Sequence, residues 1–559
     1  MPSVKIKIIQ TGDIHGCFFP YDFIKRKEAT ACLSRISSYI KEERRQYGEN
    51  LILLDSGDVL QGQPTCYYSS FVDIRQGNLA AKVYNYMGYD AVCIGNHDIE
   101  TGHGVFDKWA AENKAAMLAA NITEEKSGKP YFRPYSIFVR HGIRIAVLGI
   151  TTNAITFWLG NRVWEGMRFE NPVESARHWI DVIKEKERPD IIVGLFHTGW
   201  QGGISNGEFI ENATKEIACD VDGFDIILFG HDHRCHNETV TNKYGNAVHC
   251  LNASSNAIMF NVAEVTFTVG GERRNILRKE METRQLYSEI LPDDNDLEKC
   301  FGQEIADIKR YVNKPIGHLA KPMHTRDCFF GEAPFSDLIH KIQLDITGAD
   351  ISFTAPLAFD EQIGPGEICV ADVFNLYRYE NTIYVLRLTG REIRKYLEYS
   401  YDQWISTMHS EHDHIMKTRS FEYEGRRLTF FRNLVFNFET AAGISYDVDV
   451  SKPFGSRIHI RNMASGKKFS EGHSYAVAMH SYRGNGGNEF LIKGAGIKHS
   501  ELAARKIYES GKGIRDYIIN EFATHDSIAC KRMTNWKFIP AEWTAKAIAC
   551  DRKLLFPDD

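Results

Sequence analysis

Short apolar runs alternate with stretches of helical periodicity through the first 290 residues of the chain. The runs are four to six residues long and rich in β-branched side chains, as in strands that are buried on both faces. Such an alternation of strands and helices predicts an α/β fold. The apolar runs are residues 6–10, 51–54, 91–94, 191–196 and 226–229, and the helical stretches include residues 33–45, 80–87, 104–116 and 173–186.

The second half of the chain has its own alternation and is predicted to form a smaller α/β (α+β) domain. Between the halves, an acidic cluster at residues 293–296 can cap a helix that runs to about Val312 and is ended by Pro315. We therefore expect one domain at residues 1–290, an interdomain helix at 291–315 and a second domain at 316–559. In that domain we expect helices at 335–347 and 391–404, and strands at 351–354, 383–388, 444–450, 457–461 and 475–481.

Composition narrows the class of protein. A chain of 559 residues is too long for one hydrophobic core, and its 43% apolar and 25% charged residues are typical of a soluble globular protein. A net charge of -6 gives no electrostatic footprint for duplex nucleic acid or an anionic membrane. No apolar stretch reaches the roughly 18 residues that a transmembrane helix needs.

The N-terminal residues lack the pattern of a signal peptide. As the chain stands we expect a cytoplasmic protein, or a periplasmic or exported one if a signal peptide has been removed. The sequence favours neither a monomer nor a homo-oligomer.

A metal-binding side chain follows each of the five apolar runs. Because ligands gather beyond the carboxyl ends of strands in open α/β sheets, we expect these side chains at one rim. Imidazoles and carboxylates suit divalent ions of the Zn/Mn class, and two ions about 3.5–4 Å apart can clamp a phosphoryl group. The sequence therefore predicts a two-metal centre, with Asp58 as the bridge because Gly57 permits a sharp turn. The predicted ligands are Asp13, His15, Asp58, Asn96, His197, His231 and His233.

The ordered series Asp-x-His, Gly-Asp, Gly-Asn-His-Asp, His and Gly-His-x-His resembles that of the calcineurin-like metallophosphoesterases. The resemblance implies a four-layer αββα sandwich for the first domain and two divalent ions, of which Mn, Zn, Co and Mg all stay open. It also implies attack of metal-bound water on phosphorus. The implied ligands are Asp13, His15, Asp58 and His233 for the first ion, and Asp58, Asn96, His197 and His231 for the second.

Under this resemblance His97 is an imidazole beside the metals that is not a ligand. Such a group can donate to a phosphoryl oxygen or protonate the leaving alkoxide. Glu100 stands where the family pattern Gly-Asn-His-Glu/Asp-x-Asp places an aspartate. If Glu100 orients His97, its longer side chain must fold back towards the ring.

The resemblance extends through the second half, which looks like the substrate domain of the 5'-nucleotidase / 2',3'-cyclic-nucleotide phosphodiesterase family. In that family two aromatic rings sandwich the base, and by motif position these are Phe438 and Tyr482. Stacking suits a nucleotidase because every base has a π-face. Asn488 replaces the usual ribose-binding aspartate. The implied substrate is a nucleotide or a cyclic nucleotide.

One departure bears on the substrate. Where 5'-nucleotidases carry Gly-Gly-x-Arg, residues 355–358 read Ala-Pro-Leu-Ala, which removes a bidentate phosphate ligand. We therefore favour a 2',3'-cyclic-nucleotide 2'-phosphodiesterase / 3'-nucleotidase. A 5'-nucleotidase or a nucleotide-sugar hydrolase is the alternative, and a non-catalytic nucleotide-binding protein is a remote one.

Overall fold

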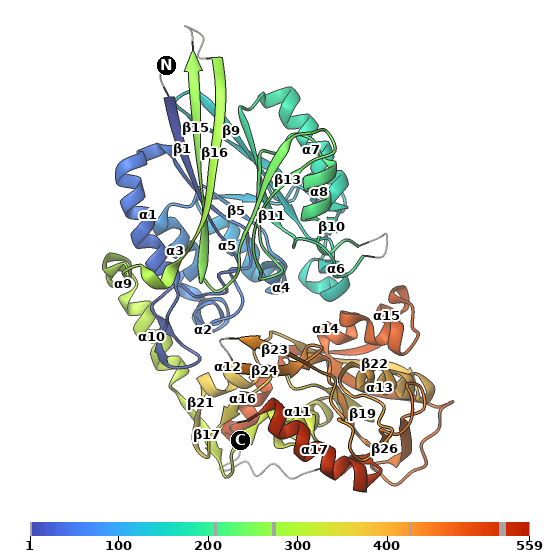
Figure 1. Ribbon diagram of the computed structural model, residues 1–559. Helices are drawn as coiled ribbons and strands as arrows, with labels where there is room; N and C mark the ends of the chain where they lie inside the picture. The colour runs from blue at the N-terminus through green and yellow to red at the C-terminus, as the bar shows by residue number, and fades with distance from the viewer. Residues whose placement is uncertain (1–2, 206–208, 271–274, 424–425, 525–532, 558–559) are drawn as a thin grey trace. The chain divides into compact units, whose positions relative to one another are not determined.

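The computed structural model divides the chain into two compact units, Met1–Val312 and Asn313–Asp559. It describes residues 3–205, 209–270, 275–423, 426–524 and 533–557. Each unit combines helices with β-sheets, as the α/β prediction requires (Figure 1). Among these described residues, no helix is both long and apolar enough to cross a membrane.

The first unit contains two six-stranded sheets. The predicted ligand-bearing strands divide between them, three in the first sheet and two in the second. The first sheet has the order β16 (Asn275–Tyr287), β15 (Met259–Gly270), β1 (Ser3–Thr11), β4 (Leu51–Asp55), β5 (Ala91–Cys93) and β6 (Ala116–Leu118). The second has the order β13 (Cys235–Thr241), β14 (Ala247–Ala253), β12 (Ile226–Phe229), β11 (Ile191–His197), β9 (Ile143–Thr151) and β8 (Tyr135–Arg140).

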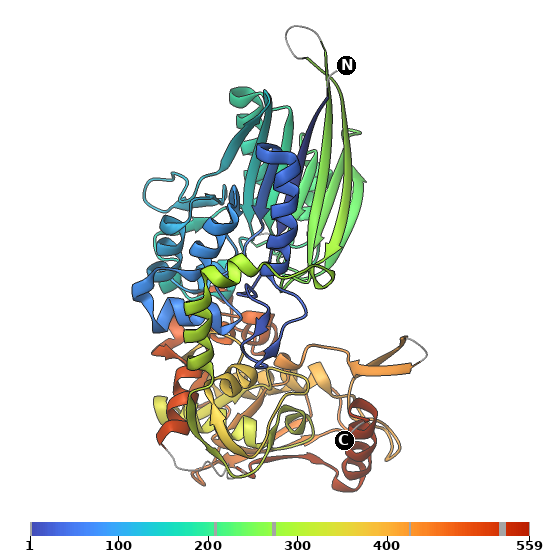
Figure 2. The same cartoon turned by 90° about the vertical axis from the view of Figure 1, so that its left-hand side faces the viewer.

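Side-chain alternation packs the two sheets against each other. Ile145 and Val147 of β9 join Ile52 and Leu54 of β4 in one core between the sheets. Residues on the opposite face of β9, such as Leu148, pack under the helices of the second sheet. Figures 1 and 2 show α1 outside the first sheet and Figure 1 shows α7 outside the second, which gives the expected four αββα layers. The outer helices include α1 (Leu33–Tyr47), α3 (Leu79–Met87), α5 (His103–Glu112), α7 (Pro172–Glu187) and α8 (Thr214–Asp220).

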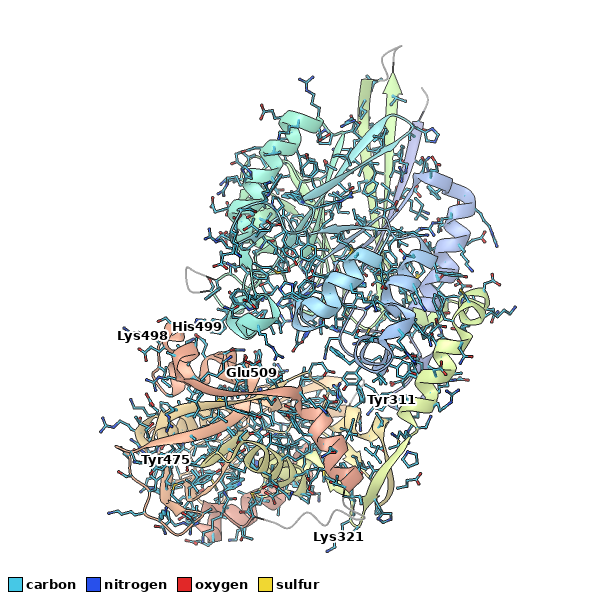
Figure 3. All side chains as sticks on the ribbon, turned by 180° about the vertical axis from the view of Figure 1, so that it is seen from behind. Tyr311, Lys321, Tyr475, Lys498, His499 and Glu509 are labelled. Atoms are coloured by element: carbon cyan, nitrogen blue, oxygen red, sulfur yellow. The ribbon has the colours of Figure 1, made fainter. Side chains whose placement is uncertain are left out.

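The helical segment after the first sheet forms two helices instead of the single one expected. The Asp294 side chain accepts the N–H groups of Asp296 and Leu297 and so caps α9 (Asn295–Cys300). The next helix, α10 (Gly302–Val312), belongs to the first unit. Its Tyr311, labelled in Figure 3, packs against Tyr68 with ring centroids 5.3 Å apart.

The second unit is built on a mixed five-stranded sheet. Its order is β25 (Thr440–Ala442), β19 (Ile351–Thr354), β28 (Ser474–His480), β22 (Thr382–Thr389) and β29 (Lys506–Gly513). Figure 3 marks Tyr475 on β28 and His499 at the start of α15. Helices include α11 (Pro334–Thr347), α12 (Val370–Leu376), α13 (Gly390–Trp404), α14 (Ser481–Gly484), α15 (His499–Arg505), α16 (Ile514–Thr524) and α17 (Ala541–Leu555). A smaller sheet holds β27 (Ile458–Met463), β26 (Ile444–Asp449) and β30 (Trp536–Ile539), and β23 (Thr418–Tyr423) pairs with β24 (Arg426–Phe431).

Candidate metal centre

The structure gathers the predicted metal ligands at the carboxyl ends of their strands. Candidate ligand atoms within each of two groups lie within 4.8 Å of one another, and Asp58 belongs to both groups. The shared carboxylate is the arrangement expected of a bridge between two ions. The groups are Asp13, His15, Asp58 and His233, and Asp58, His197 and His231.

The remaining predicted ligand, Asn96, joins the second group. It is the first residue of α4 (Asn96–Glu100), directly after β5. Its Oδ1 atom lies 2.8 Å from His231 Nδ1 and 3.0 Å from His197 Nε2. The amide oxygen therefore points at the same place as the two imidazoles.

Unusual backbone conformations turn the ligands inward. Five of them have positive φ angles, in the left-handed region that few residues other than glycine adopt. Residues held in this region cost free energy, and they cluster at functional sites. The five are Asp13 (49°), His15 (49°), Asp58 (59°), His231 (86°) and His233 (56°).

Gly95 is required for the close approach of two loops. A Cβ atom there would lie 2.2 Å from Asp58 Oδ1 and 2.4 Å from Asp58 N. Any larger residue would displace the shared carboxylate. This explains the glycine that precedes Asn96 in the sequence pattern.

Backbone carbonyls fix the ring nitrogens that face the centre. His15 Nδ1 lies 2.9 Å from Gln61 O, and His197 Nδ1 lies 2.7 Å from Ser56 O. A carbonyl only accepts hydrogen bonds, so each Nδ1 carries a proton and each Nε2 is the nitrogen turned towards the centre. His15 Nε2 then faces His233 Nε2 at 3.0 Å, and His197 Nε2 faces Asp58 Oδ2 at 3.2 Å.

This donor set fits divalent cations. Asp58 Oδ2 is buried and receives no hydrogen bond from the described residues. An unpaired buried carboxylate oxygen is costly unless a cation neutralises it. Imidazole nitrogens, carboxylates and one amide oxygen are the ligands that Zn²⁺ and Mn²⁺ accept.

The electrostatics of the site also favour a cation. Burial lowers the pKa of His197, but the charges of Asp58 and Asp13 outweigh burial and raise that pKa to about 10. Conversely, burial raises the pKa of Asp58, whereas His197 and His97 hold it well below its usual range. The carboxylates therefore stabilise positive charge at their centre.

His97 and Glu100 form the pair that the sequence suggested. Glu100 Oε2 lies 2.6 Å from His97 Nδ1, so the longer side chain does fold back to the ring. The His97 backbone N–H donates to Asp58 Oδ1 at 2.8 Å, which ties this residue to the shared carboxylate. The ring centroid of His97 is 5.6 Å from that of His15. Glu100 therefore fixes Nδ1, and Nε2 is the ring nitrogen that points away from Glu100.

Asp98 is a structural residue that the sequence analysis did not assign. It is buried, and its carboxylate accepts the N–H groups of Gly95 (2.8 Å), Asp58 (3.0 Å), Val59 (2.8 Å) and Leu60 (3.0 Å). Asp98 thereby fixes the loop that carries Asp58. Its place three residues after Gly95, at the start of a helix, was the available signal.

In the second unit the structure argues against the predicted stacking role of Phe438. That side chain is 1% exposed, and its ring stacks on Trp404 at 5.2 Å within the hydrophobic core. Trp404 and the surrounding core therefore cover this ring in the structure. Phe436, two residues earlier, is half-buried instead.

Tyr482 and Asn488 are half-buried and belong to one hydrogen-bonded network. Tyr482 donates to Asn488 Oδ1 at 3.3 Å, and Asn488 Nδ2 donates to Asn437 Oδ1 at 2.6 Å. Gly487 makes room for the tyrosine, since a Cβ atom there would lie 2.4 Å from the ring. The Arg483 guanidinium donates to Phe436 O at 3.1 Å and so joins the two half-buried aromatic residues.

A buried ion pair between Arg483 and Glu439 adjoins this network. Arg483 Nε donates to Glu439 Oε1 at 2.8 Å, and both side chains are fully buried. Burial raises the pKa of Glu439, but the Arg483 charge and the nearby His480 ring lower it to about 2. The chain segment around Tyr482 is therefore held rigidly against that around Phe436.

Comparisons with known proteins find family matches in both units of the chain. Residues 6–235 match the calcineurin-like phosphoesterase family, and residues 315–493 match the C-terminal domain of 5'-nucleotidases. The chain combines a calcineurin-like phosphoesterase domain with a 5'-nucleotidase C-terminal domain. This match confirms the predicted resemblance and fold class. Together with the ligand cluster, it confirms a metal-dependent phosphoesterase with a dinuclear divalent centre.

Relatives extend over nearly the whole chain. It is 23% identical to the 2',3'-cyclic-nucleotide 2'-phosphodiesterase/3'-nucleotidase of Yersinia enterocolitica, over 96% of this chain and 88% of that protein. It is 24% identical to the Haemophilus influenzae protein of the same name, with the same coverage. Among solved structures, the 5'-nucleotidase precursor of Thermus thermophilus shares the fold, with a TM-score of 0.63 and 20% identity over 96% of this chain and 100% of that one.

Proposed function

We propose that this protein is a 2',3'-cyclic-nucleotide 2'-phosphodiesterase and 3'-nucleotidase. The observation that carries the phosphoesterase chemistry is the complete ligand cluster around Asp58. The substrate class is supported by relatives of that name, which align with both domains of the chain. We infer that the first ion is held by Asp13, His15, Asp58 and His233, and the second by Asp58, Asn96, His197 and His231.

When bound by these residues, two divalent ions would supply the nucleophile by lowering the pKa of water and would neutralise charge on the phosphoryl oxygens. Water adds to phosphorus and the bond from phosphorus to O2' of the cyclic phosphate breaks, which leaves a 3'-phosphate. His97 donates its Nε2 proton to the departing O2', while Glu100 holds Nδ1 and orients the ring. A second hydrolysis at the 3'-phosphate releases nucleoside and phosphate.

Recognition of the nucleoside falls to the second unit in this proposal. Tyr482 offers an aromatic face for the base, and Asn488 offers an amide for a ribose hydroxyl. Phe436 takes the place that the sequence gave to Phe438, because Phe436 is half-buried and is joined to Tyr482 through Arg483. Base stacking of this kind contributes about 1–3 kcal/mol per base.

A 5'-nucleotidase is the second candidate, favoured by the match of residues 315–493 to the C-terminal domain of that class. The segment after β19 argues against a 5'-nucleotidase. Residues 355–358 are buried and read Ala-Pro-Leu-Ala, so they bring no guanidinium to a phosphate. We therefore expect 5'-nucleotides to be poorer substrates than cyclic nucleotides and 3'-nucleotides.

One assay tests these assignments. Metal-free protein is supplied in turn with Mn²⁺, Zn²⁺, Co²⁺ or Mg²⁺ and given 2',3'-cAMP, 3'-AMP, 5'-AMP and bis(p-nitrophenyl) phosphate. We expect the highest kcat/KM on 2',3'-cAMP and 3'-AMP. Fastest turnover of 5'-AMP would favour the second candidate. A metal-loaded protein inert towards every ester would instead indicate a non-catalytic nucleotide-binding protein.

A further inference from the structure

His231 faces the metal centre through a different ring nitrogen from His15 and His197. Its Nδ1 lies 2.8 Å from Asn96 Oδ1, on the side of the ligand cluster. The other two histidines turn Nδ1 to backbone carbonyls and present Nε2. To bind a metal through Nδ1, His231 must carry its proton on Nε2, and an acceptor must hold that proton.

Glu211 is the acceptor that faces this nitrogen. Its Oε1 atom lies 3.5 Å from His231 Nε2. The ring of Trp158 stacks on the imidazole, with centroids 5.5 Å apart and planes inclined by 26°. The carboxylate and the indole together restrict both the tautomer and the tilt of the His231 ring.

Glu211 is itself fixed by its own loop. Its other carboxylate oxygen, Oε2, accepts the Ile204 N–H at 2.7 Å, and its backbone N–H donates to Ile204 O at 2.9 Å. Its carbonyl accepts the Thr198 hydroxyl at 2.7 Å. Thr198 directly follows His197, so one residue braces both histidines of the second metal site.

From this geometry we propose that Glu211 is a positioning residue that sets the affinity of the second metal site relative to the first. This inference rests on the proposed dinuclear function. In the first site His15 is oriented by a backbone carbonyl, which no substitution removes. A change at Glu211 therefore acts on one of the two ions.

The test is Glu211→Gln. In this variant the new amide oxygen can still accept the Ile204 N–H, which turns the amide NH₂ towards His231 Nε2. Because an NH₂ group donates, His231 Nε2 must then accept, and the proton of the ring moves to His231 Nδ1. A proton on Nδ1 blocks metal binding there. Mn²⁺ is titrated calorimetrically into metal-free protein, and electron paramagnetic resonance distinguishes single from paired ions. We expect the Kd of one ion to rise about 10–100-fold, the usual effect of losing such a partner, while the other Kd is unchanged.

Glu238→Gln is the matched control. Glu238 Oε2 lies at the same 3.5 Å from His236 Nε2, but His236 belongs to neither ligand group. This variant should bind both ions as the wild type does. The melting temperature of each metal-free variant reports whether the fold is intact.

Two results would overturn the proposal: wild-type affinity for both ions in Glu211→Gln, or equal weakening of both. If that variant does not fold, Glu211→Asp keeps the charge but shortens its reach. It should weaken the same single ion, and unchanged affinity there would also overturn the proposal. A wild-type protein that binds only one Mn²⁺ would instead contradict the dinuclear function itself.

Discussion

Asp58 connects the two proposed metal sites, because its carboxylate belongs to both ligand groups. Asp58→Asn keeps the shape of the side chain but removes its charge. We expect this variant to lose both ions on dialysis and to lose activity, since neither site keeps its shared anion. Metal content per chain, measured by mass spectrometry, checks the prediction. Asp181→Asn, an exposed change on α7, should leave two ions bound; retention of two ions by Asp58→Asn would rule out the bridge.

His97 has a different expected signature, because we assign it to proton transfer and not to metal binding. His97→Ala should lower kcat by about 10²–10⁴-fold, the range for losing general acid–base help. Its metal content should stay at two ions. Steady-state kinetics and metal analysis on the same preparation separate the two roles. Loss of metal from this variant would make His97 a ligand.

The candidate metal ligands could be predicted from the sequence, but a residue that orients a ligand from a distant loop, such as Glu211, could not. Asp13, Asp58 and His197 stand at the ends of apolar runs, and the ends of neighbouring strands meet in space. Glu211 contacts His231 from a loop, and no local periodicity records that contact. Phe436 and Phe438 look equivalent in sequence; which of the two is buried depends on Trp404, far away along the chain.

At the level of elements, Asp98 of α4 connects this helix to the loop after β4 through hydrogen bonds to the backbone of that loop. Asp98→Ala would leave buried N–H groups without acceptors, at about 1–3 kcal/mol each. We expect a clearly lower melting temperature and weaker binding of both metals, measured by calorimetry. Asp107→Ala is the control on the neighbouring helix α5, where the side chain is 41% exposed. A comparable loss of stability in both variants would contradict the role given to Asp98.

Element boundaries follow the periodicity closely where packing agrees with it. The predicted strand 351–354 is β19, and the predicted helix 391–404 is α13 with one further residue at its start. The helix expected up to Val312 is interrupted at Phe301, which packs with Phe19 and Tyr86. This tertiary contact and the low helix propensity of Gly302, the next residue, both favour the break between α9 and α10.

On the scale of the whole molecule, the strand runs alone predict an α/β fold with all ligands at one rim, and the family resemblance implies the αββα sandwich. The structure has two sheets, because each strand hides one face in the shared core and the other under helices. Periodicity shows that a strand is buried on both faces, but it does not show which strands pair. The two-sheet arrangement was therefore predicted by the family resemblance and not by periodicity.

In the proposed function the two units separate chemistry from recognition, since the metal ligands lie in the first unit and Tyr482 in the second. Tyr482→Ala should raise KM for 2',3'-cAMP about 5- to 150-fold, as expected when 1–3 kcal/mol of stacking is lost. Hydrolysis of bis(p-nitrophenyl) phosphate should be unaffected, because this ester has no base to stack. Uniform binding lost from a remote group appears mainly in KM.

Phe438→Ala is the informative partner of that variant. Its ring lies in the core, so its removal should cost about 3–5 kcal/mol of stability and lower the melting temperature. At temperatures where Phe438→Ala stays folded, we expect the substitution to affect hydrolysis of 2',3'-cAMP and of bis(p-nitrophenyl) phosphate alike. Steady-state kinetics on both esters, with thermal unfolding of both variants, shows whether each ring acts in base recognition or in stability. If Tyr482→Ala slowed both reactions equally while Phe438→Ala acted on 2',3'-cAMP alone, the base would stack on Phe438 and the core placement of its ring would have to open for substrate.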